Sequence, residues 1–180
     1  ALQAFQLLDQ ANELGIYKFD TANSYGGGKS ENILGDWIRR QNPAVLNKIE
    51  ISSKVGNPFG ARKGQRPLSY REILFQLQNS IARIGVAQIK TYYLHEPDPT
   101  TPIDETVEAL EVALKLGDIE SVGLSNVSLG YVQKFLFACD DRLKKSLRYV
   151  QNEFHFLKQN DAVELIPFLK KHNISYVAFS

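Results

Sequence analysis

The chain has 180 residues, 43% of them hydrophobic, which is enough for one globular core and too little for two domains of ordinary size. Its 21 Lys and Arg residues nearly balance 20 Asp and Glu residues, so the formal net charge is +1. We therefore expect no nucleic-acid partner, because such proteins concentrate positive charge on one face. The single cysteine, Cys139, excludes an internal disulfide and favours a reducing compartment.

No apolar run approaches the roughly 18 residues that a membrane-spanning helix needs, and the first residues lack the layout of a signal peptide. These features predict a cytoplasmic protein without a membrane partner. The chain starts at Ala1 inside a helical pattern and stops at Ser180 directly after a β-type run. Such ends are typical of a chain cut from a larger one.

Six β-type runs alternate with six helical patterns. The runs cover residues 16–19, 49–52, 89–94, 121–125, 149–153 and 175–179. Strict alternation predicts parallel strands joined by right-handed crossovers, either in an open doubly wound sheet or in a closed barrel. An open sheet of the nucleotide-binding kind predicts a glycine-rich phosphate-binding turn after its first strand. Gly26-Gly27-Gly28 lacks the G-x-G-x-x-G spacing and is interpreted as a flexible turn, which favours the barrel.

The helical patterns carry their own start and stop signals. Thr101 and Pro102 predict a helix start, with a capping hydroxyl and a proline at the first helical position. Pro167 lies within the last helical pattern and predicts a kink. Helix ends are predicted at three glycines, which adopt the left-handed cap conformation at little cost: Gly15, Gly85 and Gly117.

Polar residues stand where the strands end. Asp20, Lys54 and His95 follow three different β-type runs, and Tyr25 lies in the loop after Asp20. Taken alone, each of these residues would more often lie in a turn, cap a helix or have a structural role. In a parallel barrel, however, the carboxyl ends of the strands share one rim, and active sites are built there. Together they predict a joint site at this rim.

An aspartate, a tyrosine, a lysine and a histidine together indicate a reaction class. A tyrosine phenol titrates near pH ~10 and is a weak acid at neutral pH. A neighbouring lysine ammonium favours the phenolate, and a carboxylate keeps a buried lysine charged. A histidine can orient a carbonyl oxygen or relay a proton. This set polarises a carbonyl group and protonates its oxygen as hydride arrives, so it implies a nicotinamide cofactor as hydride donor.

The motifs around these residues resemble the aldo-keto reductase family. The matching stretches are residues 19–26 (FDTANSYG), 30–35 (SENILG), 53–54 (SK), 94–98 (LHEPD) and 123–126 (GLSN), in the family's order along the whole chain. The resemblance implies a (β/α)₈ TIM barrel in the α/β class and an NAD(P)H-dependent oxidoreductase.

By this resemblance, Tyr25 is the general acid, Lys54 and Asp20 tune it, and His95 orients the carbonyl substrate. The implied cofactor is NADP, with NAD as the alternative, and no metal is expected. The implied cofactor-binding residues hydrogen-bond the nicotinamide carboxamide or lie against its ring: Ser125, Asn126, Gln151, Phe179 and Ser180.

The same resemblance implies that residues 1–180 form one barrel domain truncated at both ends. About six strands and six helices are present; the first strand would precede Ala1, and the C-terminal units would follow Ser180. The motifs are closest to the branches of aflatoxin-aldehyde reductases and of potassium-channel β subunits. A non-enzymatic nucleotide-sensing subunit is therefore an alternative function, although those β subunits replace the histidine that is His95 here. A (β/α)₈ lyase or isomerase is a further alternative, which would leave the cofactor-binding residues without a ring amide to bind.

Other residues have structural interpretations. Cys139 is expected to be a buried, inert thiol, and Tyr92 and Tyr93 to be core residues, one of which could point to the rim. Arg62, Lys63 and Arg66 are interpreted as a solvated loop, or alternatively as a mobile lid.

Overall fold

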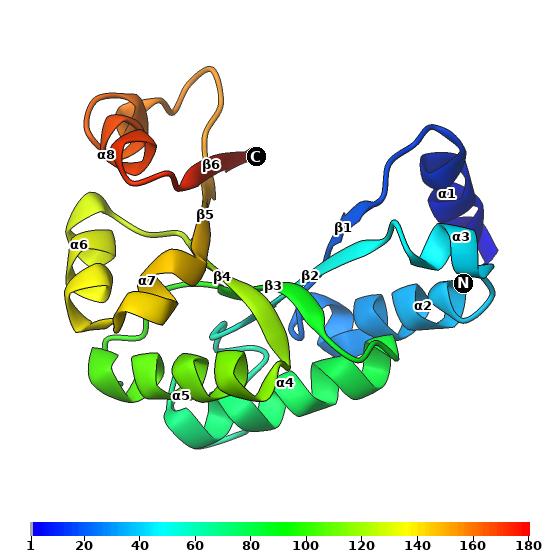
Figure 1. The fold of residues 1–180 in the computed structure, drawn as a ribbon, viewed down its shortest axis with the longest axis horizontal. Coiled ribbons are helices and arrows are strands. Elements are labelled where there is room, and N and C mark those ends of the chain that lie inside the picture. The colour runs from blue at the N-terminus through cyan, green and yellow to red at the C-terminus, as the bar shows by residue number, and fades with distance from the viewer. Residues whose placement is uncertain (1) are drawn as a thin grey trace.

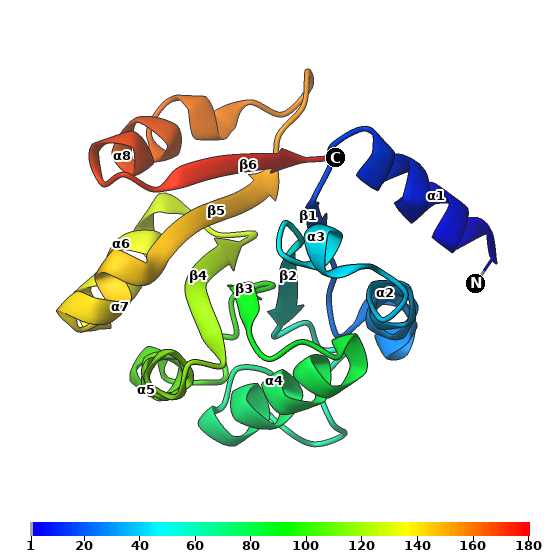
Figure 2. The same cartoon turned by 45° about the vertical axis from the view of Figure 1, so that its right-hand side comes forward.

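A computed structural model describes residues 2–180. All six strands are parallel and lie side by side in chain order, in one curled sheet (Figures 1 and 2). The strands are β1 (Lys18–Asp20), β2 (Glu50–Val55), β3 (Ile89–Leu94), β4 (Ile119–Ser125), β5 (Leu147–Glu153) and β6 (Ser175–Phe179). A doubly wound sheet reverses its strand order at a switch point. The unbroken order and the curl therefore identify part of a barrel.

The helices lie on the outer, convex side of the curled sheet (Figure 2). Within the described residues they are α1 (Leu2–Glu13), α2 (Lys29–Ile38), α3 (Pro43–Leu46), α4 (Tyr70–Ile84), α5 (Ile103–Leu116), α6 (Leu129–Ala138), α7 (Asp141–Ser146) and α8 (Leu165–Lys171), with 3₁₀ turns η1 (Tyr25–Gly28) and η2 (Asn160–Ala162). Two of them, α3 and α7, were not predicted, because less than two turns shows no readable periodicity. None of the helices in residues 2–180 is long and apolar enough to cross a membrane.

Two predicted helix signals are wrong. Helix α5 begins at Ile103, and the Thr101 hydroxyl does not cap it but donates to Asp98 Oδ2 at 2.6 Å. Pro167 is the third residue of α8, where a backbone N–H has no partner in the helix, so it lies in the first turn instead of kinking the helix. The three predicted glycine ends are confirmed, with left-handed φ angles of 80°, 76° and 81° at Gly15, Gly85 and Gly117.

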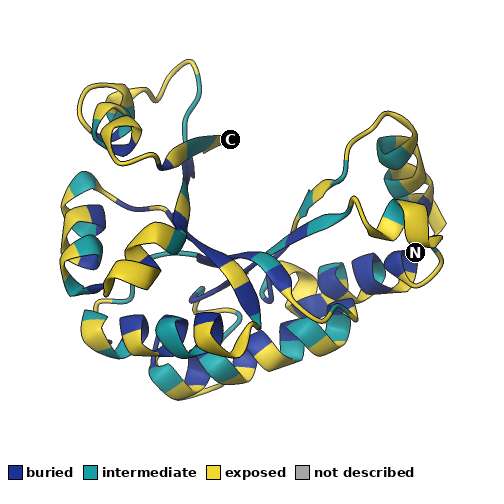
Figure 3. Cartoon of the chain, viewed as in Figure 1, coloured by how far each residue is buried: buried dark blue, intermediate teal, exposed yellow. Residues whose placement is uncertain are grey.

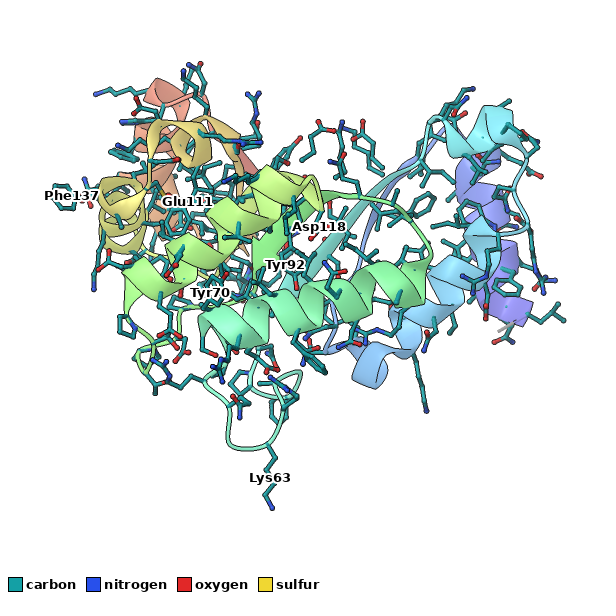
Figure 4. All side chains as sticks on the ribbon, turned by 60° about the horizontal axis from the view of Figure 1, so that its bottom comes forward. Lys63, Tyr70, Tyr92, Glu111, Asp118 and Phe137 are labelled. Carbon is teal, nitrogen blue, oxygen red and sulfur yellow. The ribbon has the colours of Figure 1, made fainter. Side chains whose placement is uncertain are left out.

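The core lies between the middle strands and the helices that cover them (Figure 3). Strands β3 and β4 are almost entirely buried, whereas β1 and β6 are largely exposed and pair with a neighbour on one side only. Tyr92 faces the helices and is fully buried, as labelled in Figure 4. The well-packed centre thus holds β3 and β4, which end next to His95 and at Ser125.

Helices α2 and α4 approach closely at Gly35. A Cβ atom there would collide with the backbone carbonyl of Arg83 and lie 2.7 Å from that of Ile84. Neither carbonyl can move without displacing α4, so we expect Gly35→Ala to lower the free energy of unfolding by about 2 kcal/mol, despite the better helix propensity of alanine.

Urea unfolding of the parent and of Gly35→Ala measures the difference in their free energies of unfolding. Gly130→Ala is the matched control, because a Cβ at this glycine of α6 would meet only Ser128 Oγ, at 4.0 Å. The control should be as stable as the parent or more stable. An unchanged urea midpoint for Gly35→Ala would contradict the close approach.

Candidate active site

Three predicted site residues come together at the carboxyl ends of neighbouring strands. Asp20 is the last residue of β1, Lys54 lies near the end of β2, and His95 directly follows β3. Because all strands are parallel, these ends form one rim, as predicted. Tyr25 is the first residue of η1, five residues after Asp20, and its side chain lies at the same rim.

Lys54 is the centre of the site. Its side chain is 1% exposed, and Nζ donates to three acceptors: Asp20 Oδ2 at 2.5 Å, the Thr21 carbonyl at 3.0 Å and Tyr25 Oη at 3.2 Å. An ammonium group has three N–H donors. All three are therefore used, and the lysine is fixed against both a carboxylate and a phenol.

The turn that carries Tyr25 depends on glycine. Gly26 and Gly27 have φ angles of 59° and 65°, and Gly28, at 88°, precedes α2. These consecutive left-handed residues reverse the chain within one turn, which other residues do at a cost. The Tyr25 side chain remains 41% exposed, and its ring meets the His95 ring edge-on with centroids 5.6 Å apart.

His95 is held in the neutral form. Burial, and to a lesser extent the positive charge of Lys54, together lower its pKa to about 4, although Asp20 acts in the opposite direction. Its Nδ1 atom is buried and has no hydrogen-bond partner within residues 2–180. A neutral imidazole has one N–H, so it can donate a hydrogen bond to a carbonyl oxygen but carries no extra proton at neutral pH. This state favours orientation over proton relay.

The lowered pKa of His95 predicts a pH dependence of stability. Between the usual 6.5 and about 4, the unfolded chain binds a proton at this histidine and the folded chain does not. The free energy of unfolding therefore falls as the pH drops through this window, by about 1 to 2 kcal/mol after allowance for partial exposure. Replacement by glutamine removes this contribution.

Urea unfolding at pH 7 and pH 4.5 compares His95→Gln with the parent. The parent should lose more stability than the variant between these pH values. His172→Gln, at the exposed end of α8, is the control and should follow the parent. Equal losses in the parent and His95→Gln would contradict a buried, neutral His95.

The residues predicted to hold the nicotinamide form a second group on the same rim. Asn126 Nδ2 donates to the His95 carbonyl at 2.9 Å and to Ser125 Oγ at 3.2 Å, and its backbone N–H donates to Gln151 O at 3.1 Å. Gln151 Nε2 donates to Asp20 Oδ2 at 3.3 Å. Ser125 and Gln151 lie opposite each other in the register of β4 and β5. The two groups are therefore joined into one network.

This second group suits a primary carboxamide. The amide nitrogens of Asn126 and Gln151 donate within the protein, which leaves their oxygens as acceptors. Ser125 Oγ accepts from Asn126 and keeps its own O–H to donate. A carboxamide has one oxygen acceptor and two N–H donors, so the three residues offer the complementary set.

Phe179 and Ser180 lie at the end of β6, beside that group in the sheet. Phe179 is paired with Glu153 of β5, its carbonyl accepts from Phe154 N at 2.9 Å, and its side chain is 40% exposed. Ser180 is exposed. Neither residue hydrogen-bonds Asp20, Tyr25, Lys54 or His95 within the part of the chain that the structure describes.

The structure adds one group that the sequence interpretation missed, and it shows which of Tyr92 and Tyr93 points to the rim. The Thr21 carbonyl is a backbone acceptor, and no sequence pattern identifies it. Tyr93 lies beside Lys54 in the β2–β3 register, with Nζ 5.9 Å from the ring centroid, so it is Tyr93, and not Tyr92, that points to the rim. A Cβ at Gly123 would overlap the Tyr93 ring. Strand alternation and register select Tyr93 over Tyr92, because Tyr93 lies directly opposite a predicted site lysine.

The basic loop is not simply solvated. Arg62 Nε donates to the buried Glu72 at 2.7 Å, and Arg66 Nη2 donates to both carboxylate oxygens of Glu105 at 2.9 and 2.7 Å. Of the three cations, Lys63 projects into solvent at the loop tip (Figure 4). All three cations are exposed, as the predicted solvated loop requires, and the two arginines in addition fasten the loop to α4 and α5.

Cys139 is buried, as expected, and burial raises the pKa of its thiol to about 12, which disfavours the reactive thiolate. No group of three or more His, Cys, Asp or Glu residues within residues 2–180 could hold a metal ion.

The chain resembles proteins of one family along almost its whole length. The sequence model of the Aldo/keto reductase family matches residues 2–180. The chain belongs to the aldo/keto reductase family. YrpG, an uncharacterized oxidoreductase of Bacillus subtilis, is 30% identical over 185 positions, which cover 98% of this chain and 56% of YrpG. The chain thus spans about half the length of the curated relatives it matches.

Two solved aldo-keto reductases have the same fold. The holo form of AKR11C1 from Bacillus halodurans gives a TM-score of 0.82 at 26% identity and covers 98% of this chain and 56% of that one. Tm1743, a thermostable aldo-keto reductase in complex with the inhibitor epalrestat, gives 0.85 at 24% identity, covering 99% and 60%. The six-stranded sheet is therefore part of a (β/α)₈ barrel, as predicted.

Proposed function

We propose that the complete protein reduces an aldehyde or a ketone to an alcohol with hydride from a nicotinamide dinucleotide, and that Tyr25 supplies the proton. The observation that carries this proposal is the buried Lys54 ammonium, which hydrogen-bonds both the Asp20 carboxylate and the Tyr25 phenol. Family membership supports an oxidoreductase activity of this kind.

The proposed proton transfer follows from this contact. As hydride reaches the carbonyl carbon, negative charge develops on the oxygen, and a proton donor within hydrogen-bond reach lowers the barrier. The Tyr25 phenol is open to the rim and supplies this proton. Lys54, with Nζ 3.2 Å from the phenol oxygen, stabilises the phenolate that is left.

Asp20 and His95 have supporting roles in the proposal. Asp20 pairs with Lys54 at 2.5 Å and so offsets the cost of burying a positive charge. His95 lies against the Tyr25 ring, and its single N–H orients the substrate oxygen toward the phenol. A substrate carbonyl between these two groups is polarised before hydride arrives.

The cofactor is proposed to be NADP, with NAD as the alternative. The donor and acceptor set of Ser125, Asn126 and Gln151 supports a nicotinamide carboxamide at this rim, and the exposed Phe179 ring supplies an aromatic surface for the nicotinamide ring. The nicotinamide, when bound, supplies the hydride. The choice of NADP rests on the family resemblance.

Steady-state oxidation of NADPH and of NADH by the complete protein tests the proposal. With a panel of aldehydes and ketones, we expect turnover with at least one aldehyde, and faster turnover with NADPH. Tight nucleotide binding without turnover on any carbonyl would overturn the reductase proposal and favour the nucleotide-sensing alternative. Absence of nucleotide binding would overturn both and favour another barrel chemistry.

We propose further that the protein acts in the cytoplasm on a small carbonyl compound, without nucleic-acid or membrane partners. The near-balance of charge and the single cysteine support this.

A further inference from the structure

Glu31 and Ser53 form a buried hydrogen bond directly behind the candidate active site. Ser53 precedes Lys54 on β2, and because side chains alternate between the two faces of a strand, Ser53 points toward the helices while Lys54 points to the rim. Ser53 Oγ donates to Glu31 Oε1 at 2.5 Å, and both side chains are fully buried. Glu31 is the third residue of α2, so this bond joins the start of α2 to the neighbour of Lys54.

Arg83 of α4 binds the other oxygen of the same carboxylate. Its Nε donates to Glu31 Oε2 at 2.6 Å, and its Nη2 donates to Ser80 Oγ at 3.3 Å. The Arg83 side chain also packs against the turn that carries Tyr25, since a Cβ at Gly28 would lie 3.1 Å from Arg83 Cδ. A buried carboxylate is costly unless it is paired, and here both oxygens have a partner.

A second contact runs parallel to the first. Thr21 Oγ1 donates to Ser30 Oγ at 2.8 Å, and the Thr21 carbonyl accepts from Lys54 Nζ at 3.0 Å. Ser30 and Glu31 are consecutive residues at the start of α2. The start of α2 therefore hydrogen-bonds two residues next to the lysine: Thr21, whose carbonyl accepts from Lys54, and Ser53, which precedes Lys54 on β2.

We propose that Glu31 is a positioning residue for the reductase reaction: through Ser53 and the start of α2, it fixes the separation between the Lys54 ammonium and the Tyr25 phenol. Glu31 touches neither group itself. The kinetic consequence rests on the proposed function, whereas the effect on the lysine contacts does not.

The charged and titratable groups around this arrangement are few. The phenol and the ammonium face the Asp20 carboxylate after β1, the neutral His95 after β3 and the Tyr93 ring on β3, whose centroid lies 5.9 Å from Lys54 Nζ. Glu31 faces Arg83 of α4 and lies near Tyr92 of β3, whose pKa burial raises well above its usual value, with Glu72 of α4 also nearby. The guanidinium is thus the one cation that the structure places on the Glu31 carboxylate within residues 2–180.

Glu72 is a matched control. It is also fully buried in a helix, pairs with an arginine (Arg62, at 2.7 Å) and accepts from Gln76 at 2.7 Å. It makes no hydrogen bond to β2 within the described residues. Loss of the Glu72 charge should therefore lower the free energy of unfolding about as much as loss of the Glu31 charge does. It should leave the hydrogen bonds of Lys54 Nζ unchanged.

The first measurement is kinetic and uses the complete protein. Ser53→Ala and Glu31→Gln should each lower kcat about tenfold with KM changed less than about twofold, because the proton donor is misplaced and binding is not. They should also move the alkaline limb of the pH–rate profile to higher pH, because the phenol loses contact with the ammonium. Glu72→Gln should move neither. If kcat falls while the alkaline limb stays in place, the role is merely structural and the proposal is overturned.

The second measurement needs no turnover. An ammonium held by three acceptors exchanges its protons slowly enough to be seen by ¹⁵N NMR, and Lys54→Met assigns the signal. We expect this signal in the parent and in Glu72→Gln, and its loss in Ser53→Ala and Glu31→Gln. An unchanged signal in Ser53→Ala, the mildest substitution, overturns the proposal. If the parent shows the NMR signal but reduces no carbonyl, the proposed function fails and the positioning role is still decided by this measurement.

Discussion

Tyr25→Phe should lower kcat about 1,000-fold or more while the dissociation constant of the cofactor changes less than about twofold. The substitution removes one oxygen atom, which is the acceptor of the Lys54 hydrogen bond at 3.2 Å and, in our proposal, the source of the proton. General acid catalysis typically contributes a factor of about 10² to 10⁴. Steady-state kinetics and fluorescence titration with NADPH measure the two quantities separately.

The control for this variant is Tyr17→Phe, which removes the same atom from a tyrosine whose ring packs against Lys48, before β1. It should retain the activity of the parent. Full turnover in Tyr25→Phe would remove this phenol from the mechanism, and loss of cofactor binding in that variant would show that the phenol serves binding instead.

Lys54→Met should abolish most activity, lowering kcat by about 10² to 10⁴, and should not reduce stability. Methionine keeps the length of the side chain but removes the ammonium that stabilises the phenolate. The Lys54 side chain is only 1% exposed, so the apolar methionine side chain suits this position. Replacing a buried ion by an apolar group of similar size is often neutral or stabilising. Asp20, which is 41% exposed, regains water in its place.

Kinetics and urea unfolding of the same preparation test both parts of this prediction. Lys90→Met is the control, because this lysine pairs with Glu120 near the opposite ends of the strands. It should keep full activity. If Lys54→Met kept its activity, or if it unfolded at a much lower urea concentration, the lysine would be a structural residue and not a tuning group.

The convergence of the site residues could be predicted from the sequence because it depends only on where parallel strands end. Parallel strands bring their carboxyl ends to one rim regardless of the conformation of the loops. The strand–helix alternation was therefore enough to predict that Asp20, Lys54 and His95 converge. The position of Tyr25 was predicted from its short loop, and the glycine turn accounts for its return to the rim. Periodicity likewise predicted all six strands, with bounds shifted by up to three residues.

The missed features depend on contacts that a sequence pattern does not contain. The Thr21 carbonyl is part of the backbone and has no residue signature. Glu31 and Arg83 are 52 residues apart, and their pairing depends on how closely α2 packs on α4. The Thr101 cap was wrong because a nearby carboxylate, Asp98, competes for the hydroxyl. The first two features therefore depend on contacts between distant parts of the chain, and the third depends on a competing acceptor three residues away.

The central claim is that hydride reaches a carbonyl carbon at this rim while Tyr25 protonates the oxygen. The most direct test is to supply the complete protein with an aldehyde and with cofactor deuterated at C4 of the nicotinamide, and to analyse the alcohol by mass spectrometry. We predict one deuterium on the carbinol carbon with the parent and almost no alcohol with Tyr25→Phe. An alcohol that carries no deuterium, or equal yields from the two proteins, would contradict the claim.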